Sequence, residues 1–173
     1  GLNVRIARLA STGAVDAAIV KMSAEVKALG AHVSILDQAQ AAADWKASGE
    51  QTLDFFQAPT EQDCLWRLSV PQTAPVLDVQ VNGAACAQYI EWHGAQRWVW
   101  APLSDAEAIR NAASAVGGQA TLFRRPQQAS AAMPVSVPVF TPLDAVHQRI
   151  QQALKQEFDP AGLFGPRRLN AHF

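Results

Sequence analysis

Strand-like and helical patterns alternate from the start of this 173-residue chain, and their order narrows the folds that it can adopt. Residues 2–7 alternate apolar with polar or small side chains, as a half-buried strand does. In residues 12–29 the apolar side chains fall on one helical stripe, and Ser11 or Thr12 can cap the first turn. Residues 32–36 (HVSIL) predict a second strand, so we expect a β-α-β opening.

The middle of the chain predicts a second group of strands. Residues 37–58 are rich in Ala and Gln and predict one or two short helices. Residues 64–71 (CLWRLSVP) predict a strand, and residues 88–101 predict a hairpin. A helix over residues 104–116 and a strand over residues 120–124 (ATLFR) complete a β-β-β-α-β order. Residues 1–125 are therefore expected to form an α+β domain, an antiparallel sheet with helices on one face, built from ferredoxin-like halves.

The last third of the chain changes in composition. Residues 126–141 are rich in Pro, Gln, Ser and Ala, and their prolines forbid a helix, which indicates a linker or an extended crossing segment. Residues 142–173 predict a C-terminal helix, capped by Thr141, followed by a return segment. The apolar stripe of this helix must dock on another surface.

Composition excludes several classes of function. A formal net charge of −1, with 17% charged residues, gives no electrostatic field for binding nucleic acid. Two cysteines, Cys64 and Cys86, make no disulfide framework, and Cys and His show no metal-ligand spacing. The apolar runs are too short to span a membrane, and a cytoplasmic location is expected.

The end of the chain carries the most specific motif. Residues 154–169 (LKQEFDPAGLFGPRRL) resemble the terminal segment of FAD-linked oxidases, F-D-P-x-G-x-F-N-P-G-R. In chain order, residues 65–75 (LWRLSVPQTAP), 90–101 (IEWHGAQRWVWA) and 117–121 (GGQAT) resemble the cap region of these proteins. Among FAD-linked oxidases, the FAD-binding subunits of bacterial glycolate oxidases are the most similar in these motifs.

This resemblance implies the C-terminal, substrate-covering cap of an FAD-dependent 2-hydroxy-acid (glycolate) oxidase subunit. FAD would be held by a domain that is not in this chain, so the fragment alone is expected to hold no cofactor and to be inactive. The implied partners are the FAD-binding domain of the same full-length subunit, a sister flavin subunit and an iron–sulphur subunit, which would also bring it to the inner face of the membrane. The alternative is a stand-alone ferredoxin-like module that binds proteins or senses small molecules.

The tail motif also supplies candidate residues near the flavin. They are Asp159, Gly162, Phe164, Pro166 and Arg168. Asp159 is expected to accept bonds from freed backbone donors and Phe164 to anchor the chain by packing. The sequence departs from the family pattern at Gly165, where Asn is expected, and at Arg167, where Gly is expected. A flavin contact by that Asn side chain would be lost here.

Oxidation of a 2-hydroxy acid needs a cation that holds the substrate carboxylate. If Trp66, Leu68 and Val70 pack under the helices, Arg67 points to the open face of the sheet. An odd hairpin loop (HGA) would place Trp98 and Trp100 under the helices and pair Glu91 with Arg97 on the open face; a two-residue loop would place Trp92 beside Arg97. The substrate-binding candidates are Arg67, Arg97 and Tyr89, with an ordinary polar sheet face as the alternative. No catalytic residue is identified.

Overall fold

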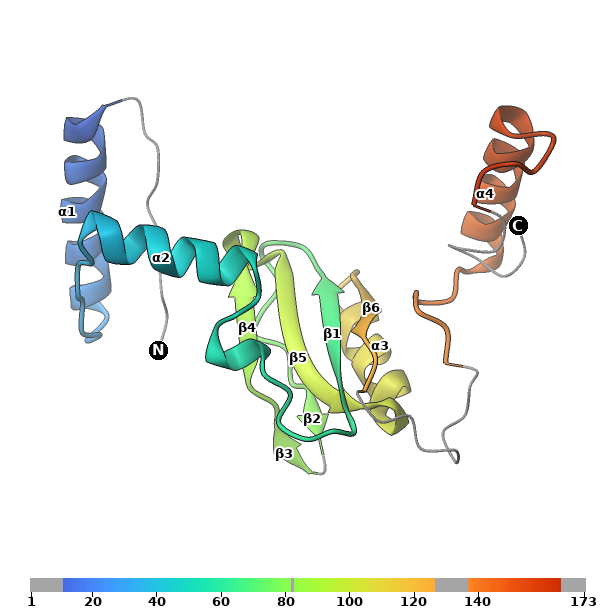
Figure 1. Cartoon of the computed structure of the whole chain (residues 1–173), viewed down its shortest axis with the longest axis horizontal. Helices are drawn as coiled ribbons and strands as arrows, with labels where there is room; N and C mark the ends of the chain where they lie inside the picture. The colour runs from blue at the N-terminus through green and yellow to red at the C-terminus, as the bar shows by residue number, and fades with distance from the viewer. Residues whose placement is uncertain (1–10, 82, 127–136, 166–173) are drawn as a thin grey trace. The chain divides into compact units, whose positions relative to one another are not determined.

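A computed structural model describes residues 11–81, 83–126 and 137–165 of the chain (Figure 1). The chain divides into two compact units, residues 1–51 and residues 52–173. The predicted strand at residues 2–7 and most of the proline-rich segment lie outside the described residues.

The first unit contains two helices. Helix α1 (Thr12–Ala28) begins at Ser11, whose Oγ accepts a hydrogen bond from the N–H of Ala14 at 3.2 Å, as predicted for an N-cap. Helix α2 (Gln38–Gly49) begins at Asp37, whose carboxylate accepts from the N–H of Gln40 at 2.8 Å. None of the described residues in this unit is buried. This unit has no core of its own in the described part of the chain.

The predicted strand at residues 32–36 is wrong. Residues 31–37 connect the two helices without entering a β-ladder. A strand needs a neighbour that bonds its backbone N–H and C=O groups, and an alternating pattern does not supply that neighbour. The β-α-β opening, and with it the ferredoxin-like arrangement, is therefore not confirmed.

The second unit is built on a four-stranded antiparallel sheet (Figure 1). Its strands are β1 (Asp63–Ser69), β4 (Gln88–Glu91), β5 (Gln96–Pro102) and β6 (Gln119–Arg124), in the order β4-β5-β1-β6. A separate two-stranded ladder joins β2 (Gln80–Val81) to β3 (Ala84–Ala85). The helical elements are η1 (Asp54–Phe56), η2 (Trp92–Gly94), η3 (Leu103–Asp105), α3 (Ala106–Ser114) and α4 (Ala145–Phe158). The predicted α+β class is confirmed.

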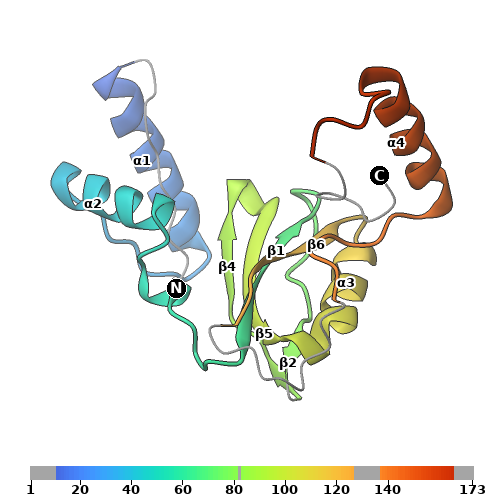
Figure 2. The same cartoon turned by 45° about the vertical axis from the view of Figure 1, so that its right-hand side comes forward.

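Helix α3 covers one face of the sheet (Figure 2). Trp66 and Leu68 of β1 are fully buried there, together with Val99 of β5 and Ile109 of α3. The indole N–H of Trp66 donates to the carbonyl of Ala101 at 3.2 Å, so its one polar group is satisfied. Side chains of this size each stabilise the fold by about 1.5–3 kcal/mol through burial. The prediction that Trp66 and Leu68 pack under a helix is confirmed.

The opposite face of the sheet is covered as well, where an open polar face was expected. Phe56 of η1 is 1% exposed and packs edge-on against Trp98, with ring centroids 5.7 Å apart. The indole N–H of Trp100 donates to the carbonyl of Phe55 at 2.6 Å. Trp98 and Trp100 therefore lie away from α3, which corrects their predicted position. Both faces of β5 are buried, so alternation along this strand could not identify the face under the helix.

The outer edge of β6 is paired with the end of the proline-rich segment. The N–H of Leu122 donates to the carbonyl of Val139 at 2.8 Å, and the hydroxyl of Thr141 donates to the carbonyl of Ala120 at 2.8 Å. Covering an edge strand in this way protects it from pairing with other chains. Thr141 is therefore not the helix cap that was predicted; Asp144 caps α4 by accepting bonds from two backbone N–H groups of its first turn.

Candidate functional site

The face of the sheet opposite α3 gathers six aromatic side chains and is named here the aromatic face. Its members are Phe55, Phe56, Tyr89, Trp98, Trp100 and Phe123. Tyr89 stacks on Phe55 with ring centroids 5.3 Å apart, and Phe123 packs edge-on against Trp98 at 4.8 Å. Phe123 is nevertheless 46% exposed, so the aromatic face remains partly open to solvent at this position.

Arg67 lies on the aromatic face. Tyr89, Trp98 and Arg67 oppose one another in register across β4, β5 and β1, which places all three side chains on one face. The guanidinium carbon of Arg67 lies 5.9 Å from the centroid of the Phe123 ring, a cation–π distance. The aromatic face therefore carries a cation beside aromatic rings. Two of the predicted substrate-binding residues, Arg67 and Tyr89, lie together on it.

Arg97 lies on the other face of the sheet, which corrects its predicted position. It pairs with Leu68, whose side chain faces α3, and it is only 2% exposed. Its Nε donates to the carbonyl of Gly94 at 3.1 Å, and its two terminal nitrogens donate to the carbonyls of Pro75 at 2.5 Å and Ala74 at 2.7 Å. Burial lowers the pKa of this guanidinium. Arg97 thus ties the loop that precedes β2 to the hairpin turn.

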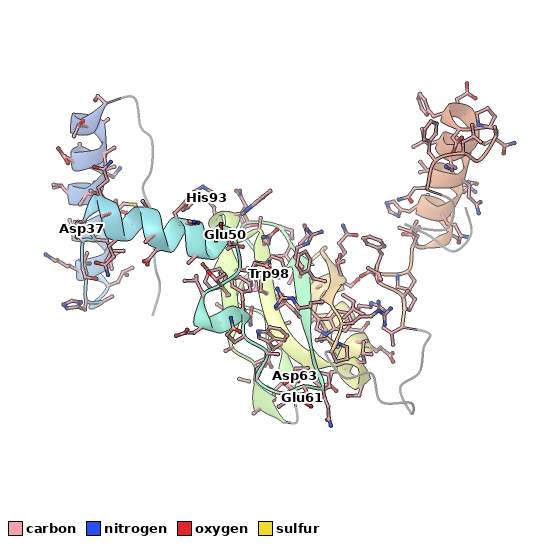
Figure 3. The ribbon with its side chains drawn as sticks, in the orientation of Figure 1. Asp37, Glu50, Glu61, Asp63, His93 and Trp98 are labelled. Carbon is pink, nitrogen blue, oxygen red and sulfur yellow. The ribbon has the colours of Figure 1, made fainter. Side chains whose placement is uncertain are left out.

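The hairpin has a register that neither predicted loop would produce. Ile90 opposes Arg97, and Glu91 opposes Gln96. Four residues, 92–95, separate the paired strands, so the predicted pairing of Glu91 with Arg97 is wrong. The carboxylate of Glu91 instead accepts from the indole N–H of Trp98 at 2.7 Å and from the amide of Gln96 at 3.0 Å. His93 lies in the turn at the end of this hairpin, and Trp98 lies within the sheet (Figure 3).

The tail motif forms a closed turn around Asp159. One carboxylate oxygen accepts from the N–H of Leu163 at 2.9 Å, and the other accepts from the N–H of Phe164 at 3.0 Å and from the ammonium of Lys155. The same ammonium donates to the carbonyl of Phe164 at 2.6 Å. Gly162 takes a φ of +64° within the turn. The bond from Lys155, followed by the bond from the Phe164 N–H, lowers the pKa of Asp159 to about 2.

The Asp159 turn leaves its apolar side chains exposed. Phe164 is 74% exposed, so it does not anchor the tail by burial as predicted. On α4, Val146, Ile150 and Leu154 form one stripe, and each is about half exposed. Pro166 and Arg168, the other tail candidates, lie outside the described residues. The described part of the tail is a preorganised turn whose apolar side chains remain available for contact.

The Gly117–Gly118 pair does not fit the phosphates of FAD. Gly117 and Gly118 follow the C-terminal end of α3, and their N–H groups donate to the carbonyls of Ser114 and Ala113, both at 2.9 Å. A phosphate needs free N–H groups, as at a helix N-terminus. No group of three or more His, Cys, Asp or Glu side chains that could hold a metal ion occurs within residues 11–81, 83–126 and 137–165.

The two cysteines remain small, protonated fillers. Cys64 is fully buried, and desolvation raises the pKa of its thiol to about 11. Burial also raises the pKa of Cys86, whose Sγ donates to the carbonyl of Trp100 at 3.2 Å. Neither thiol has the lowered pKa of a reactive cysteine.

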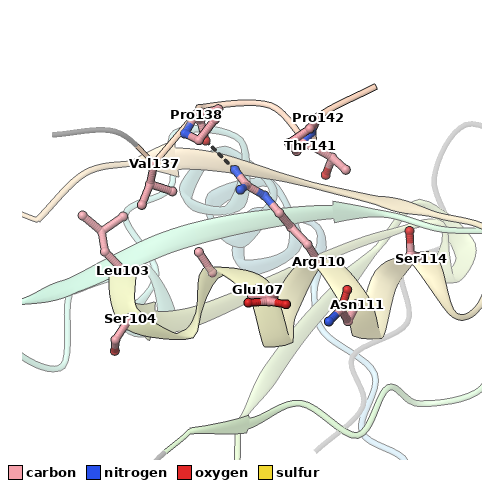
Figure 4. Close-up of a pocket in the computed structure, with 11 residues that line it drawn as sticks. Leu103, Ser104, Glu107, Arg110, Asn111, Ser114, Val137, Pro138, Thr141 and Pro142 are labelled. Atoms are coloured by element: carbon pink, nitrogen blue, oxygen red, sulfur yellow. Dashed lines mark hydrogen bonds between the residues drawn. The ribbon is translucent and has the colours of Figure 1, made fainter. Parts of the chain in front are cut away.

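Sequence reasoning missed a groove between α3 and residues 137–142 (Figure 4). It has a volume of about 570 Å³ and is lined by apolar side chains, such as Leu103 and Val137, and by polar side chains of α3, namely Glu107, Arg110, Asn111 and Ser114. Arg110 crosses the groove and donates to the carbonyl of Pro138, while its guanidinium carbon lies 5.7 Å from the Trp66 ring centroid. Arg110 therefore fastens this segment to the sheet. Arg110 and Pro138 are nearly thirty residues apart in the sequence, so no local pattern could predict this contact.

The chain is similar to a curated protein. It is 38% identical over 127 residues to "Glycolate oxidase subunit GlcE" of Escherichia coli (strain K12). The aligned part covers 73% of this chain and 31% of that protein, so the chain spans about a third of the length of its curated relative. Neither a protein-family model nor a solved structure matches the chain. Every helix in the described residues is too short or too polar to cross a lipid bilayer.

Proposed function

We propose that this chain, which is related to part of a glycolate oxidase subunit, forms the C-terminal cap of an FAD-linked 2-hydroxy-acid oxidase subunit. The observation that carries the proposal is the 38% identity to GlcE over 127 residues. The match to only 31% of GlcE supports the idea that a larger polypeptide supplies the rest of the activity. The alternative, a stand-alone sensing or interaction module, gains no comparable support from the comparisons.

FAD belongs to the part of the polypeptide outside this sequence. The N–H groups of Gly117 and Gly118 are already bonded, so they cannot cradle a pyrophosphate. Flavin accepts the hydride in this class of reaction, and the cap contributes residues around the substrate. The isolated chain is then inactive and nearly free of flavin.

The aromatic face is the candidate wall of the substrate cavity. Arg67 holds a positive charge beside Phe123, and its only described partner there is the ring. A guanidinium of this kind can bind a carboxylate through two parallel hydrogen bonds. Tyr89 stands on the same face across the sheet and adds a phenolic hydroxyl. Arg97 is not retained as a substrate ligand, because three backbone carbonyls bind its guanidinium.

The α4 stripe and the Asp159 turn form the candidate surface for the FAD-binding domain of the same polypeptide. Val146, Ile150 and Leu154 are about half exposed, and Leu163 and Phe164 are 74% exposed. A 14-residue helix gains little stability on its own, so packing of its apolar stripe on another domain would stabilise it. The hydrogen bonds from the N–H groups of Leu163 and Phe164 to the Asp159 carboxylate fix the backbone of these two residues before docking occurs.

The remaining assignments concern the assembly. A sister flavin subunit and an iron–sulphur subunit complete the proposed enzyme, because a flavin that has accepted a hydride must pass its electrons on to another acceptor. The assembly is cytoplasmic and reaches the inner face of the membrane through these partners.

Arg67 provides the test of the substrate-cavity proposal. In the full-length assembly, Arg67→Ala should raise the KM for a 2-hydroxy acid by about tenfold or more, because a charge-assisted bidentate contact contributes about 2 kcal/mol. Arg67→Lys should raise KM less than Arg67→Ala does, since an ammonium keeps the positive charge but cannot make the two parallel hydrogen bonds of a guanidinium. Arg149→Ala, which removes an exposed arginine from α4, is the matched control and should leave KM unchanged.

The outcomes separate two parts of the proposal. Unchanged kinetics in Arg67→Ala, with the subunits still assembled, would mean that the aromatic face is structural. Absence of 2-hydroxy-acid oxidation by the wild-type assembly would remove the proposed function altogether.

A further inference from the structure

The turn that joins β4 to β5 contains three consecutive residues with positive φ. The φ angles are 51° at Trp92, 54° at His93 and 95° at Gly94. Glycine adopts this region freely, but a bulky residue such as Trp does so rarely. Two adjacent non-glycine residues in this conformation store strain, and such strain persists only where the surrounding structure imposes it.

Contacts beneath the turn impose this conformation. Arg97 donates to the carbonyl of Gly94 and, with its other nitrogens, to the carbonyls of Ala74 and Pro75. A Cβ at Gly94 would lie 3.0 Å from the carbonyl oxygen of Gln72, so the backbone is packed closely here. These contacts join the turn to the neighbouring loop and leave it little freedom.

The turn presents Trp92 to solvent. Its side chain is 73% exposed and that of Trp45 on α2 is 62% exposed, whereas Trp66, Trp98 and Trp100 are 0%, 3% and 7% exposed. Burial of the indole therefore does not offset the strain at this residue.

We propose that the Trp92–His93 turn is a preformed contact for a partner subunit, with the Trp92 indole entering an apolar pocket of that subunit. The partner is a second polypeptide of the assembly, so this inference rests on the proposed function; the relative is itself described as a subunit. Tryptophan is one of the residue types enriched among energetically dominant interface contacts. A turn that is already rigid loses little conformational entropy when it binds.

Two adjacent asparagine variants test the proposal. Asn tolerates the left-handed region, so Trp92→Asn and His93→Asn should each relieve strain and leave the melting temperature unchanged or raised by about 2–4 °C. Only Trp92→Asn removes the indole. With the full-length subunit and the purified sister flavin subunit, Trp92→Asn should weaken the Kd of assembly by about tenfold or more. His93→Asn, the matched control, should change it less than about twofold.

Each other outcome overturns the proposal in a distinct way. Equal assembly by wild type and Trp92→Asn would show that the indole is not in the interface. A lower melting temperature in Trp92→Asn, with a proportionate loss of assembly, would assign Trp92 a structural role. A changed flavin spectrum with unchanged assembly would place the indole against the cofactor. Failure of the wild-type subunit to bind the sister flavin subunit would overturn the proposed function as well.

Discussion

Replacement of Arg97 by methionine should destabilise the fold substantially. The variant loses three hydrogen bonds from a buried charged donor, each of which contributes about 1.5 kcal/mol or more. Part of this loss is offset, because methionine needs no desolvation of a charge and water can reach some of the freed carbonyls. The expected net cost is about 3 kcal/mol. For a chain of this size the melting temperature should fall by about 6–12 °C.

Thermal unfolding of the purified chain, followed by circular dichroism, measures this effect. Arg67→Met is the matched control, because Arg67 lies on the same strand pair but on the aromatic face, where its described contact is the Phe123 ring. Its cost should stay below about 1 kcal/mol. Equal, small losses in both variants would refute the assignment of Arg97 to the face that carries α3 and to the carbonyls of two loops.

Three further variants test other parts of the fold. Gly118→Ala should lower the free energy of unfolding by about 2 kcal/mol or more, since its Cβ would lie 2.4 Å from the carbonyl oxygen of Ser69. The control Gly13→Ala, whose Cβ would meet no atom within 4 Å, should not destabilise the fold. Equal melting temperatures in the two variants would contradict the packing at Gly118. The folded-state pKa of Asp159, about 2, is below its ordinary value of 3.8, so its stabilising contribution is present above about pH 4 and is lost as pH falls toward 2. In Asp159→Asn, the free energy of unfolding should therefore depend less steeply on pH between about pH 4 and pH 2. An unchanged slope would contradict the hydrogen bonds assigned to the Asp159 carboxylate. Phe164→Ala should shift the stability of the isolated chain by less than about 0.5 kcal/mol, because the ring is 74% exposed; a larger loss would mean that the tail packs on the core.

Local signals in the sequence predicted much of the secondary structure. Helix α1 and its N-cap depend on residues within a few positions of one another; the helix was predicted with Ser11 or Thr12 as its cap, and Ser11 is the cap. The strand at Cys64 and the burial of Trp66 and Leu68 also followed from short-range alternation. The tail turn around Asp159 was predicted because its donors lie four and five residues away.

Predictions that depended on distant partners were wrong or incomplete. Residues 32–36 have the alternation of a strand, but no described segment pairs with them. The hairpin was misregistered because Trp92 was assigned to a strand, whereas it turns away at a positive φ. The aromatic face is covered by Phe55 and Phe56 from outside the sheet, so the sequence could not indicate that Trp98 has a second place to be buried.

Of the candidate site residues, Arg67 and Tyr89 were correctly expected to share one face. Arg97 was separated from them by a one-residue change of register, which moves a side chain to the opposite face of a sheet. The role of Arg110 depends on the segment around Pro138, which no periodicity links to α3. The roles of Arg67 and Tyr89 in substrate binding remain predictions.

Comparison of flavin content between this 173-residue chain and a longer polypeptide that contains it tests the cap assignment most directly. Both proteins are purified, titrated with FAD and followed by flavin fluorescence and absorbance. We expect about one FAD per chain in the longer polypeptide and no saturable submicromolar binding by the 173-residue chain, because the N–H groups of Gly117 and Gly118 are already bonded. Stoichiometric submicromolar binding of FAD by the 173-residue chain, or a longer polypeptide that holds no flavin, would contradict the cap assignment.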